Sequence, residues 1–335
     1  MTDQVYAISV SARAVLNLHS LNNEGGEGNQ IQTRMVDIIY HDENGQPMQA
    51  NVNAISGDMF KHIQAEHLHR IATESGLPLC AACRRFDANR MSADPDFREW
   101  VKTKPTQVQV VDRLVENCTI DDLEGNLITE GNLSAPRKSV VEFGWVVGVP
   151  GKVTSEEYFH VKYVPDRREK PTDKDSREGN LGQAIFHRPA NSGIYAIVCN
   201  LEVARIGYND ISQQYAASVD REARYSALLQ SLLYSFVEMN GAMRNTQLPH
   251  LTALHGVVSV SYGIAPAPTV SPLNPDFVAE IQGVRDTLNA LHQRNDGDRA
   301  TVAIHEFHNL AEFADIFRSL IQTTTPYTLR VGAAA

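Results

Sequence analysis

Residues 5–19 read VYAISVSARAVLNLH, and this stretch decides the fold. Apolar side chains alternate with small or polar ones along most of its length, which is the pattern of a β-strand that buries one face. We therefore expect it to form the first strand of a central sheet. A glycine-rich, flexible loop with the sequence NNEGGEGN follows at residues 22–29, and TRMVDIIY at residues 33–40 predicts a second strand.

Two helices stand out in the sequence. The first begins after Ser56, because serine is a favoured N-cap residue and an amphipathic run follows it until Gly76 and Pro78. The second is predicted over residues 220–239, where leucines recur at helical spacing.

Between the helices, residues 78–105 read as irregular or briefly helical, and most of the remainder is rich in β-branched residues. Strands are predicted there at residues 107–120, 139–149, 157–164, 183–188 and 193–206. After the second helix the sequence predicts a buried strand at 254–262, helices at 276–293 and 309–321, and a short strand at 300–305. This order fits an α+β fold of the ferredoxin-like or RNA-recognition-motif type, with helices on one face of a sheet.

The composition is that of an ordinary globular chain, with 42% hydrophobic and 21% charged residues among 335. The N-terminus shows no secretory signal, and no stretch reaches the ~18 apolar residues of a membrane helix. We therefore expect a soluble, cytoplasmic protein without a membrane partner. The formal net charge of −10 argues against a simple nucleic-acid binder, so any groove for nucleic acid has to be basic locally.

The start of the first helix is the best physical candidate for a binding site. The first turn of a helix leaves backbone N–H groups unpaired and carries partial positive charge, so a phosphate fits there. Gly57 would let a ligand approach the backbone beside Ser56, and Lys61 lies one turn further on. The alternative is an ordinary capped helix with a solvated lysine.

Two loops add polar groups to this candidate. Residues 22–29, with Arg34 after them, offer glycine amides, amide side chains and a cation, but they lack the Gly-Lys-Ser/Thr ending of a P-loop. The loop GAMRN at residues 241–245 follows the second helix and carries Arg244 at the edge of the sheet. The alternatives are a flexible hairpin loop and a plain helix end with an exposed arginine.

Cys80 and Cys83 have the spacing of a zinc knuckle. Structural zinc takes four ligands, so Cys118 and one histidine would have to complete the set. The histidines considered are His62, His67 and His69. The alternative is a pair of reduced thiols in a surface segment, and we expect no other cofactor.

Four segments taken together resemble the DevR-like family of backbone subunits of type I CRISPR Cascade complexes, which are built on RNA-recognition-motif folds. They are VYAISVSARAVLNLHSLNNEGGEGNQIQTR at residues 5–34, ISGDMFKH at 55–62, SGIYAIVCNLEVARIGYN at 192–209 and GAMRNTQLPHL at 241–251. The Ser-Gly helix start and the Gly-Ala-x-Arg loop are specific in combination.

The resemblance implies a hand-shaped subunit that performs no catalysis. Copies would stack along a CRISPR guide RNA beside other Cascade subunits and leave its bases free to pair with target DNA. The palm would comprise residues 1–61 and 106–265, the fingers a helical insertion at 62–105, and the thumb a β-hairpin at about 158–195, followed by packing helices at 266–335.

The family also implies which residues face the guide. Those expected along its backbone are Asn22, Asn29, Arg34, Ser56, Gly57, Lys61, Arg244 and Asn245. Phe186 and His187, near the base of the thumb, are expected to act as wedges. Because guides vary in sequence, such a carrier should recognise the backbone and shape of RNA rather than its bases.

Other interpretations stay open. An RNA endonuclease of the same superfamily would use a convergent set of His, Tyr and Lys side chains, and no such set is evident. Cleavage of target RNA by a thumb aspartate is a further alternative, because Asp166, Asp173 and Asp175 lie in the charged arm at 165–182. The chain could also be a regulator that binds a protein rather than RNA.

Overall fold

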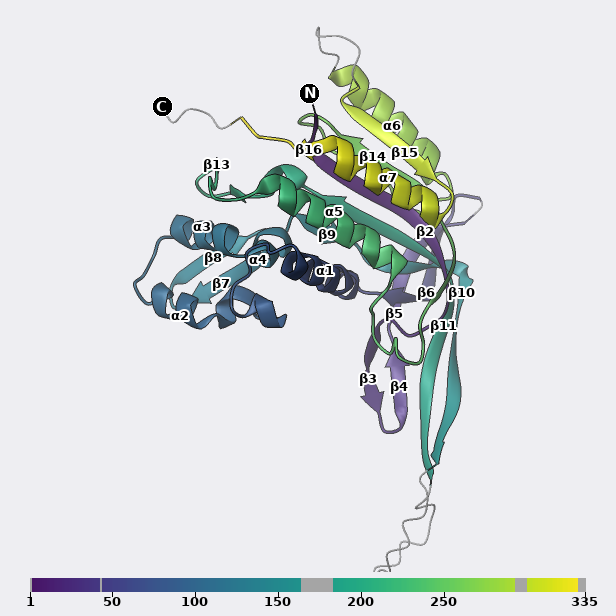
Figure 1. The fold of residues 1–335 in the computed structure, drawn as a ribbon. Helices are drawn as coiled ribbons and strands as arrows, with labels where there is room; N and C mark the ends of the chain where they lie inside the picture. The colour runs from purple at the N-terminus through teal and green to yellow at the C-terminus, as the bar shows by residue number, and fades with distance from the viewer. Residues whose placement is uncertain (1, 43, 164–182, 293–299, 331–335) are drawn as a thin grey trace, which may run out of the picture.

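Strand β2 (Ala7–His19) lies at the centre of an antiparallel sheet, as its sequence predicts (Figure 1). The structure is a computed structural model that describes residues 2–42, 44–163, 183–292 and 300–330. On one side β2 pairs with β11 (Gln183–Leu201), and on the other with β14 (His250–Ser261).

The alternation along β2 has a clear physical origin. Ile8, Val10 and Leu16 are completely buried and belong to the main hydrophobic core. The small polar side chains between them face the other side of the sheet, where the hydroxyl of Ser9 donates a hydrogen bond of 2.6 Å to the carbonyl of Pro268. A proline-rich connector thus covers the second face of the strand.

The order of strands and helices confirms the predicted α+β class. Helix α1 (Gly57–Glu74) follows β2, β9 (Val141–Phe143) pairs with β11, and α5 (Arg221–Val237) precedes β14. The chain order β2-α1-β9-β11-α5-β14 and the sheet order β14-β2-β11-β9 are those of a ferredoxin-like palm.

The two helices cover one face of this palm. The rings of Phe60 in α1 and Phe236 in α5 lie 5.7 Å apart, and Phe236 also packs against Phe313 of α7 (Leu310–Thr323) at 4.9 Å. Helix α6 (Phe277–Leu291) lies on the opposite face, where Phe277 packs against Val257 of β14.

The C-terminal segment contains strands as well as the predicted packing helices. β15 (Val302–Phe307) extends the sheet beyond β14, and β16 (Thr324–Pro326) pairs in parallel with β1 (Asp3–Val5). None of the helices in the described ranges is long and apolar enough to cross a membrane.

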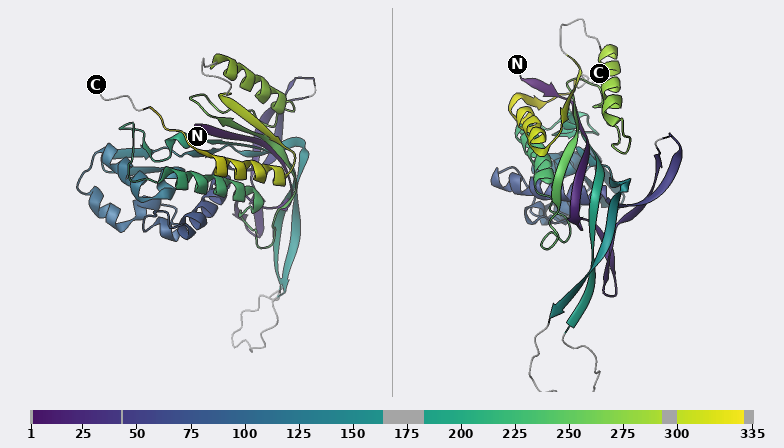
Figure 2. Two further views of the ribbon diagram at one scale, coloured as in Figure 1. Left: turned by 45° about the horizontal axis from the view of Figure 1, so that its top comes forward. Right: turned by 90° about the vertical axis from the view of Figure 1, so that its right-hand side faces the viewer.

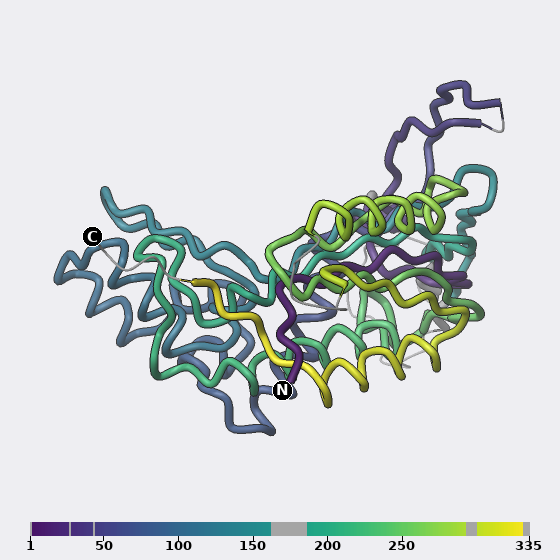
Figure 3. Tube along the Cα trace, turned by 90° about the horizontal axis from the view of Figure 1, so that it is seen from above, coloured from purple at the N-terminus to yellow at the C-terminus, as the bar shows by residue number. Residues whose placement is uncertain are grey.

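A helical lobe projects from the palm (Figures 1 and 3). It contains α2 (Pro95–Val101), α3 (Gln107–Asn117), α4 (Thr119–Glu124), β7 (Asn126–Glu130) and β8 (Leu133–Arg137). Two short 3₁₀ turns, at Cys83–Arg85 and Arg90–Ala93, precede α2.

The prediction of a strand at 107–120 is wrong, because α3 and the start of α4 occupy these residues. Val110, Val111, Leu114 and Val115 are buried at helical spacing, and Thr106 and Gln109 form a capping box at the helix start. The many valines favoured a strand, so neither the helical spacing nor the capping box was recognised in the sequence.

The helical lobe also differs in extent from the predicted fingers at 62–105. Residues 62–74 form the rest of α1 and pack on α5, whereas the lobe continues to Arg137. The division into palm, fingers and thumb as functional parts stays a prediction.

A long hairpin of β10 (Val146–Tyr163) and β11 extends away from the sheet (Figure 2). Its pairing shifts register between Gly148 and Val153, and the pairing of β11 with β2 shifts next to Gly193. A Cβ atom at Gly193 would lie 2.4 Å from the carbonyl oxygen of Lys152. The charged arm at 165–182, with its three aspartates, lies outside the described residues.

Two smaller hairpins stand beside the long one. β3 (Asn23–Glu27) and β4 (Gln30–Thr33) replace the predicted flexible loop, and β5 (Met35–His41) pairs with β6 (Pro47–Ile55). A two-residue pair, β12 (Tyr208–Asn209) and β13 (Gln214–Tyr215), lies before α5.

The helical lobe is joined to the palm by buried ion pairs around Asp122 in α4. One carboxylate oxygen lies 2.7 Å from the guanidinium of Arg137 in β8, and the other lies 2.6 Å from that of Arg224 in α5. All three side chains are almost completely buried. Arg224 also donates to the carbonyl of Val115 in α3, so that it links α5 to both α3 and α4.

We expect Arg224→Leu to lower the free energy of unfolding by about 3–5 kcal/mol, because it leaves a buried carboxylate with one partner fewer. Arg318→Ala is the control, since Arg318 forms an exposed pair with Asp315 at 3.0 Å that should contribute less than about 1 kcal/mol. Urea unfolding of both variants measures the difference. Equal losses would contradict the importance of the buried cluster.

Candidate nucleic-acid interface

Asn22 brings together three of the segments that the sequence singled out. Its side-chain oxygen accepts a hydrogen bond of 2.7 Å from the backbone amide of Ser56, at the start of α1. Its backbone carbonyl accepts one of 3.2 Å from the amide of Arg34. The end of β2, the tip of α1 and the start of β5 therefore form one surface.

The tip of α1 opens into a cleft. The hydroxyl of Ser56 accepts a hydrogen bond from the amide of Met59, which confirms the predicted N-cap. Within the described residues, the backbone amides of Gly57 and Asp58 have no hydrogen-bond acceptor. Ser56 and Gly57 line a cleft of about 370 Å³ together with Trp145. The tip can therefore receive an anion.

Gly57 lies close to the backbone of the sheet. A Cβ atom at this position would lie 2.6 Å from the carbonyl oxygen of Phe143 and 3.2 Å from that of Gly144. The close backbone neighbours are thus at the end of β9, and the approach of a ligand to Gly57 stays a prediction. The glycine lets α1 begin directly against the sheet.

Lys61 is only partly available to a ligand. Its ammonium group donates to the carbonyl of Glu124 at 3.0 Å and to the hydroxyl of Ser139 at 2.8 Å. The pKa of Lys61 is lowered, and burial of the side chain is the main cause. Lys61 also lines a second cleft of about 680 Å³ between α1 and the helical lobe. Lys61 therefore ties the helical lobe to α1 and lines both clefts.

Arg34 lies between an acid and an aromatic ring. Its Nε atom is 2.8 Å from the carboxylate of Glu24, and its guanidinium stands 5.7 Å from the ring centre of Trp145. Trp145 is 44% exposed in the cleft, so a nucleic-acid base can stack on it. Trp145 and the cleft residue Lys138 were not predicted, although an isolated tryptophan between β9 and β10 and an Arg-Lys pair before β9 could have indicated them.

The loop after α5 packs beside the same surface. The amide of Ala242 donates to the carbonyl of Leu21 at 3.1 Å. Arg244 pairs with the carboxylate of Glu238 at 2.6 Å and also contacts Asn240, whereas Asn245 is exposed. The structure thus places Arg244 and Asn245 close to the segment of Asn22.

The remaining predicted residues meet on the outer part of the described hairpin, where His160 pairs with Phe186 and Phe159 with His187, and not at its base. The carbonyl of Asn29 accepts a hydrogen bond of 2.9 Å from the amide of His187. The ring of Phe186 stacks on His160 at 5.7 Å and lies under the guanidinium of Arg188 at 4.7 Å. Phe186 is thus covered by its neighbours, and its role as a wedge stays a prediction, as does that of His187.

The three predicted cations share one property. Arg34 and Arg244 each contact a carboxylate, and Lys61 lies 3.9 Å from that of Glu124. The phosphates of a nucleic acid would therefore have to displace these carboxylates or share the cations with them. In this way a chain with an acidic exterior could still offer a groove that binds phosphates locally.

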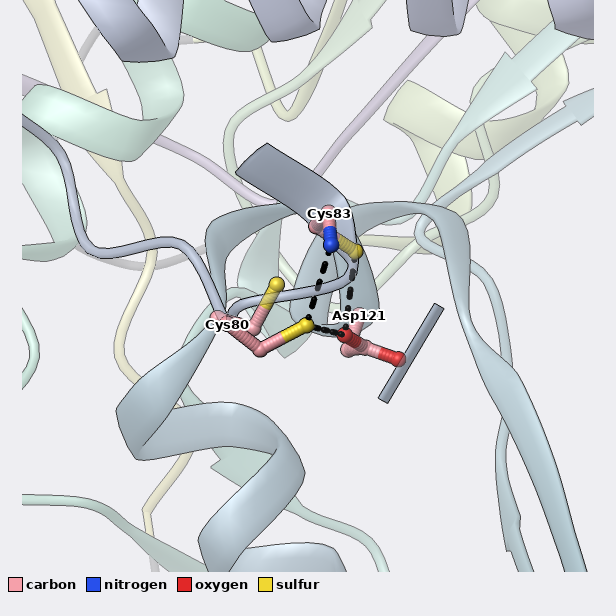
Figure 4. A group of neighbouring side chains, drawn as sticks. Cys80, Cys83 and Asp121 are labelled. Carbon is pink, nitrogen blue, oxygen red and sulfur yellow. Dashed lines mark hydrogen bonds between the residues drawn. The ribbon is translucent and has the colours of Figure 1, made fainter. Parts of the chain in front are cut away.

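Cys80 and Cys83 lie in a buried cluster in the helical lobe (Figure 4). Cys118 belongs to it, as the sequence suggested, but the fourth member is Asp121 instead of a histidine. Burial raises the pKa of Asp121 to about 6.

The three histidines have other partners, which excludes them from the cluster. The rings of His62 and His69 pack against Phe86, and Nε2 of His67 is 2.7 Å from the carbonyl of Glu238. The prediction that a histidine completes the set is therefore wrong.

The chain is similar to a defined group of proteins. Residues 10–282 match the family model described as CRISPR-associated negative auto-regulator DevR/Csa2. Two relatives come from Saccharolobus solfataricus (strain ATCC 35092 / DSM 1617 / JCM 11322 / P2). CRISPR-associated protein Cas7/Csa2 1 is 25% identical over 69% of this chain and 71% of its own length. CRISPR-associated aCascade subunit Cas7/Csa2 2 is 24% identical over 75% of this chain and 78% of its own length.

Solved structures with a similar trace include a chain of a CRISPR RNA-guided surveillance complex. It covers 94% of this chain and 98% of its own, with a TM-score of 0.48 and 11% identity. Csc2 of Thermofilum pendens covers 95% of this chain and 87% of its own, with a TM-score of 0.38 and 13% identity.

We expect Gly57→Ala to lower the free energy of unfolding by about 1–3 kcal/mol, because its methyl group would collide with the carbonyl of Phe143. Gly283→Ala is the matched control, since Gly283 lies inside α6 with open space around it and alanine there should stabilise by about 0.5–1 kcal/mol. Thermal unfolding compares them. If Gly57→Ala unfolds at the same temperature as the wild-type chain, close packing does not require the glycine, and the approach of a ligand explains it better.

We also expect stability to depend on His19, which lies at the end of β2 against Tyr195. Burial lowers the pKa of His19 from 6.5 to about 4, so the unfolded chain binds the proton more tightly. This contribution, about 3 kcal/mol, is complete above pH 6.5 and is lost as pH falls towards 4. Unfolding measured at pH 6.5 and at pH 4 should show that stability falls less in His19→Gln than in the wild-type chain. An equal fall in both would contradict the assignment to His19.

Proposed function

The chain belongs to the CRISPR-associated DevR/Csa2 family, and we propose that it is the repeating backbone subunit that holds a guide RNA in a type I surveillance complex. Its relatives carry the name Cas7/Csa2, and one is named as an aCascade subunit. On this proposal copies of the chain bind side by side on the guide and assemble with other Cascade subunits. The bound guide then pairs with target DNA.

One observation supports the proposal most directly. The hydrogen bond between Asn22 and Ser56 holds the tip of α1 against the end of β2, and Ser56 and Gly57 line the cleft at this tip. Helix-tip amides hold a phosphate without regard to the base attached to it. A carrier of variable guides needs this kind of contact.

The aromatic and cationic side chains would complete the binding surface. The exposed ring of Trp145 offers a stacking platform that accepts any base, and Arg34 beside it can pair with a phosphate. Weak contacts of this kind add up along one strand, because each bound copy raises the effective concentration of the next contact.

The carboxylates that hold the cations in the free chain would act as placeholders. Glu24 occupies Arg34, and Glu238 occupies Arg244. A phosphate strand would replace each carboxylate with a stronger multivalent anion. This exchange reconciles RNA binding with the net charge of −10.

We propose a binding role without chemistry. Of the histidines in the described residues, His62 lines the larger cleft, and its ring packs against Phe86. Incubation of the assembled complex with complementary RNA and Mg²⁺ tests this statement. Regularly spaced cuts would favour cleavage by a thumb aspartate instead.

We expect Arg34→Ala to weaken binding to guides of unrelated sequence by the same factor. It should also lower the salt dependence of log K by about 0.7 for each phosphate group that the chain no longer neutralises. Glu24→Gln should do the opposite and strengthen binding, because it releases Arg34. Fluorescence anisotropy with two unrelated guides, each over a salt series, measures both effects.

Arg318→Ala serves as the control for this experiment, since it removes a cation on α7 that pairs with Asp315. A change of base preference in Arg34→Ala would indicate direct readout of bases. A full-length chain that ignores RNA at low salt would support the regulator alternative.

A further inference from the structure

Four potential metal ligands converge inside the helical lobe. The sulfur atoms of Cys80, Cys83 and Cys118 and a carboxylate oxygen of Asp121 all lie within 4.8 Å of one another. All four residues are buried. Figure 4 shows Cys80, Cys83 and Asp121 pointing towards a common centre.

The distances fit a tetrahedral ion. Oδ2 of Asp121 is 3.8 Å from the sulfur of Cys80 and 3.5 Å from that of Cys83. A zinc ion with bonds of about 2.3 Å to sulfur and about 2.0 Å to oxygen separates such ligands by about 3.5–3.8 Å. An ion can therefore enter with small side-chain adjustments.

The ligands come from two turns with the same spacing. Cys80-x-x-Cys83 lies after α1, and Cys118-x-x-Asp121 lies at the junction of α3 and α4. In the first turn the amide of Cys83 donates to the sulfur of Cys80 at 3.3 Å, which holds this sulfur towards the cluster. The two turns are joined directly, because the amide of Thr119 donates to the carbonyl of Pro78 at 2.8 Å.

Asp121 is oriented as a ligand. Its Oδ1 atom accepts hydrogen bonds from the side chain of Asn126 at 2.6 Å and from the amide of Met91 at 3.3 Å. These donors fix the carboxylate so that Oδ2 faces the sulfur atoms. Metal-binding carboxylates are held in the same way by outer hydrogen bonds.

The charge of the cluster is not balanced by a neighbouring side chain. Asp121 is completely buried, and within the described part of the chain no lysine or arginine forms an ion pair with it. Burying a carboxylate without a positive partner is costly, and three thiols supply none. A divalent cation would satisfy the carboxylate and the thiolates together.

We propose that Cys80, Cys83, Cys118 and Asp121 bind one structural Zn²⁺ ion. Three sulfur ligands select a soft or borderline ion over Mg²⁺ or Ca²⁺, and four buried protein ligands leave no open position for a substrate. The ion cross-links the segment after α1 to the α3–α4 junction. It thereby fixes a lobe whose own elements are short.

A disulfide explains the cluster less well. A bond between Cys80 and Cys83 would use two members and leave Cys118 and Asp121 buried beside it without a role. All four cysteines of the chain are free in the structure. Cys199 is equally buried but lies in β11, outside the cluster, which makes it a matched control.

The metal content of the purified full chain tests the proposal. We expect one zinc per chain by mass spectrometry of the metal, and we expect Cys199→Ser to keep it. Cys118→Ser and Asp121→Ala should lower zinc affinity at least about tenfold, whereas Asp121→His should retain zinc because histidine is itself a zinc ligand. Titration of the metal-free chain with Co²⁺ should give the sulfur-to-metal charge-transfer band of a tetrahedral thiolate site.

Each result decides between the alternatives even if a variant fails to fold. A folded wild-type chain without zinc, or one that contains a disulfide between Cys80 and Cys83, would overturn the proposal. So would zinc that is lost in Cys199→Ser but kept in Cys118→Ser. None of these outcomes depends on RNA binding, so the site can fail while the proposed function stands.

Discussion

The position of the helical lobe depends on one buried carboxylate, that of Asp122, which lies between the guanidinium groups of Arg137 and Arg224. A buried ion pair stabilises little by itself, but removing one partner is costly, so the geometry tolerates little variation. Because Arg224 comes from the palm and Asp122 from the lobe, this ion pair fixes the position of the lobe relative to the palm. The same placement positions Glu124 and Ser139, which line the larger cleft and accept hydrogen bonds from Lys61 of α1.

The proposed binding surface would use backbone groups more than charge. The amides at the tip of α1 belong to the backbone, and the hydrogen bond from Ser56 to Asn22 holds this tip beside the cleft. The predicted cations around them are all engaged by oxygen atoms of the protein. Such a surface holds few free charges that would attract nucleic acids without selection, which suits a chain whose exterior is acidic.

Much of the palm could be predicted from the sequence, because β2 and α5 carry strong two-fold and helical periodicity. The failure at α3 arose where valines favoured a strand while the capping box at Thr106 and Gln109 indicated a helix. Ser56 could be found as a cap from its residue type alone. Its link to Asn22 could not, because the bond joins residues 34 positions apart and depends on how the sheet folds back. Asp121 was missed because histidines were sought, although its spacing from Cys118 repeats that of Cys80 and Cys83.

The register shifts at the root of the long hairpin have a mechanical consequence. On the sheet side of Gly148 and Gly193, β10 and β11 are held by other strands, whereas beyond them the two pair almost entirely with each other. A regular ladder is stiff along its length, and a bulge concentrates bending at one point. The direction of the hairpin is therefore set at these irregularities. Because the amide of His187 further out donates to the carbonyl of Asn29 between β3 and β4, a change in this direction would move both hairpins together.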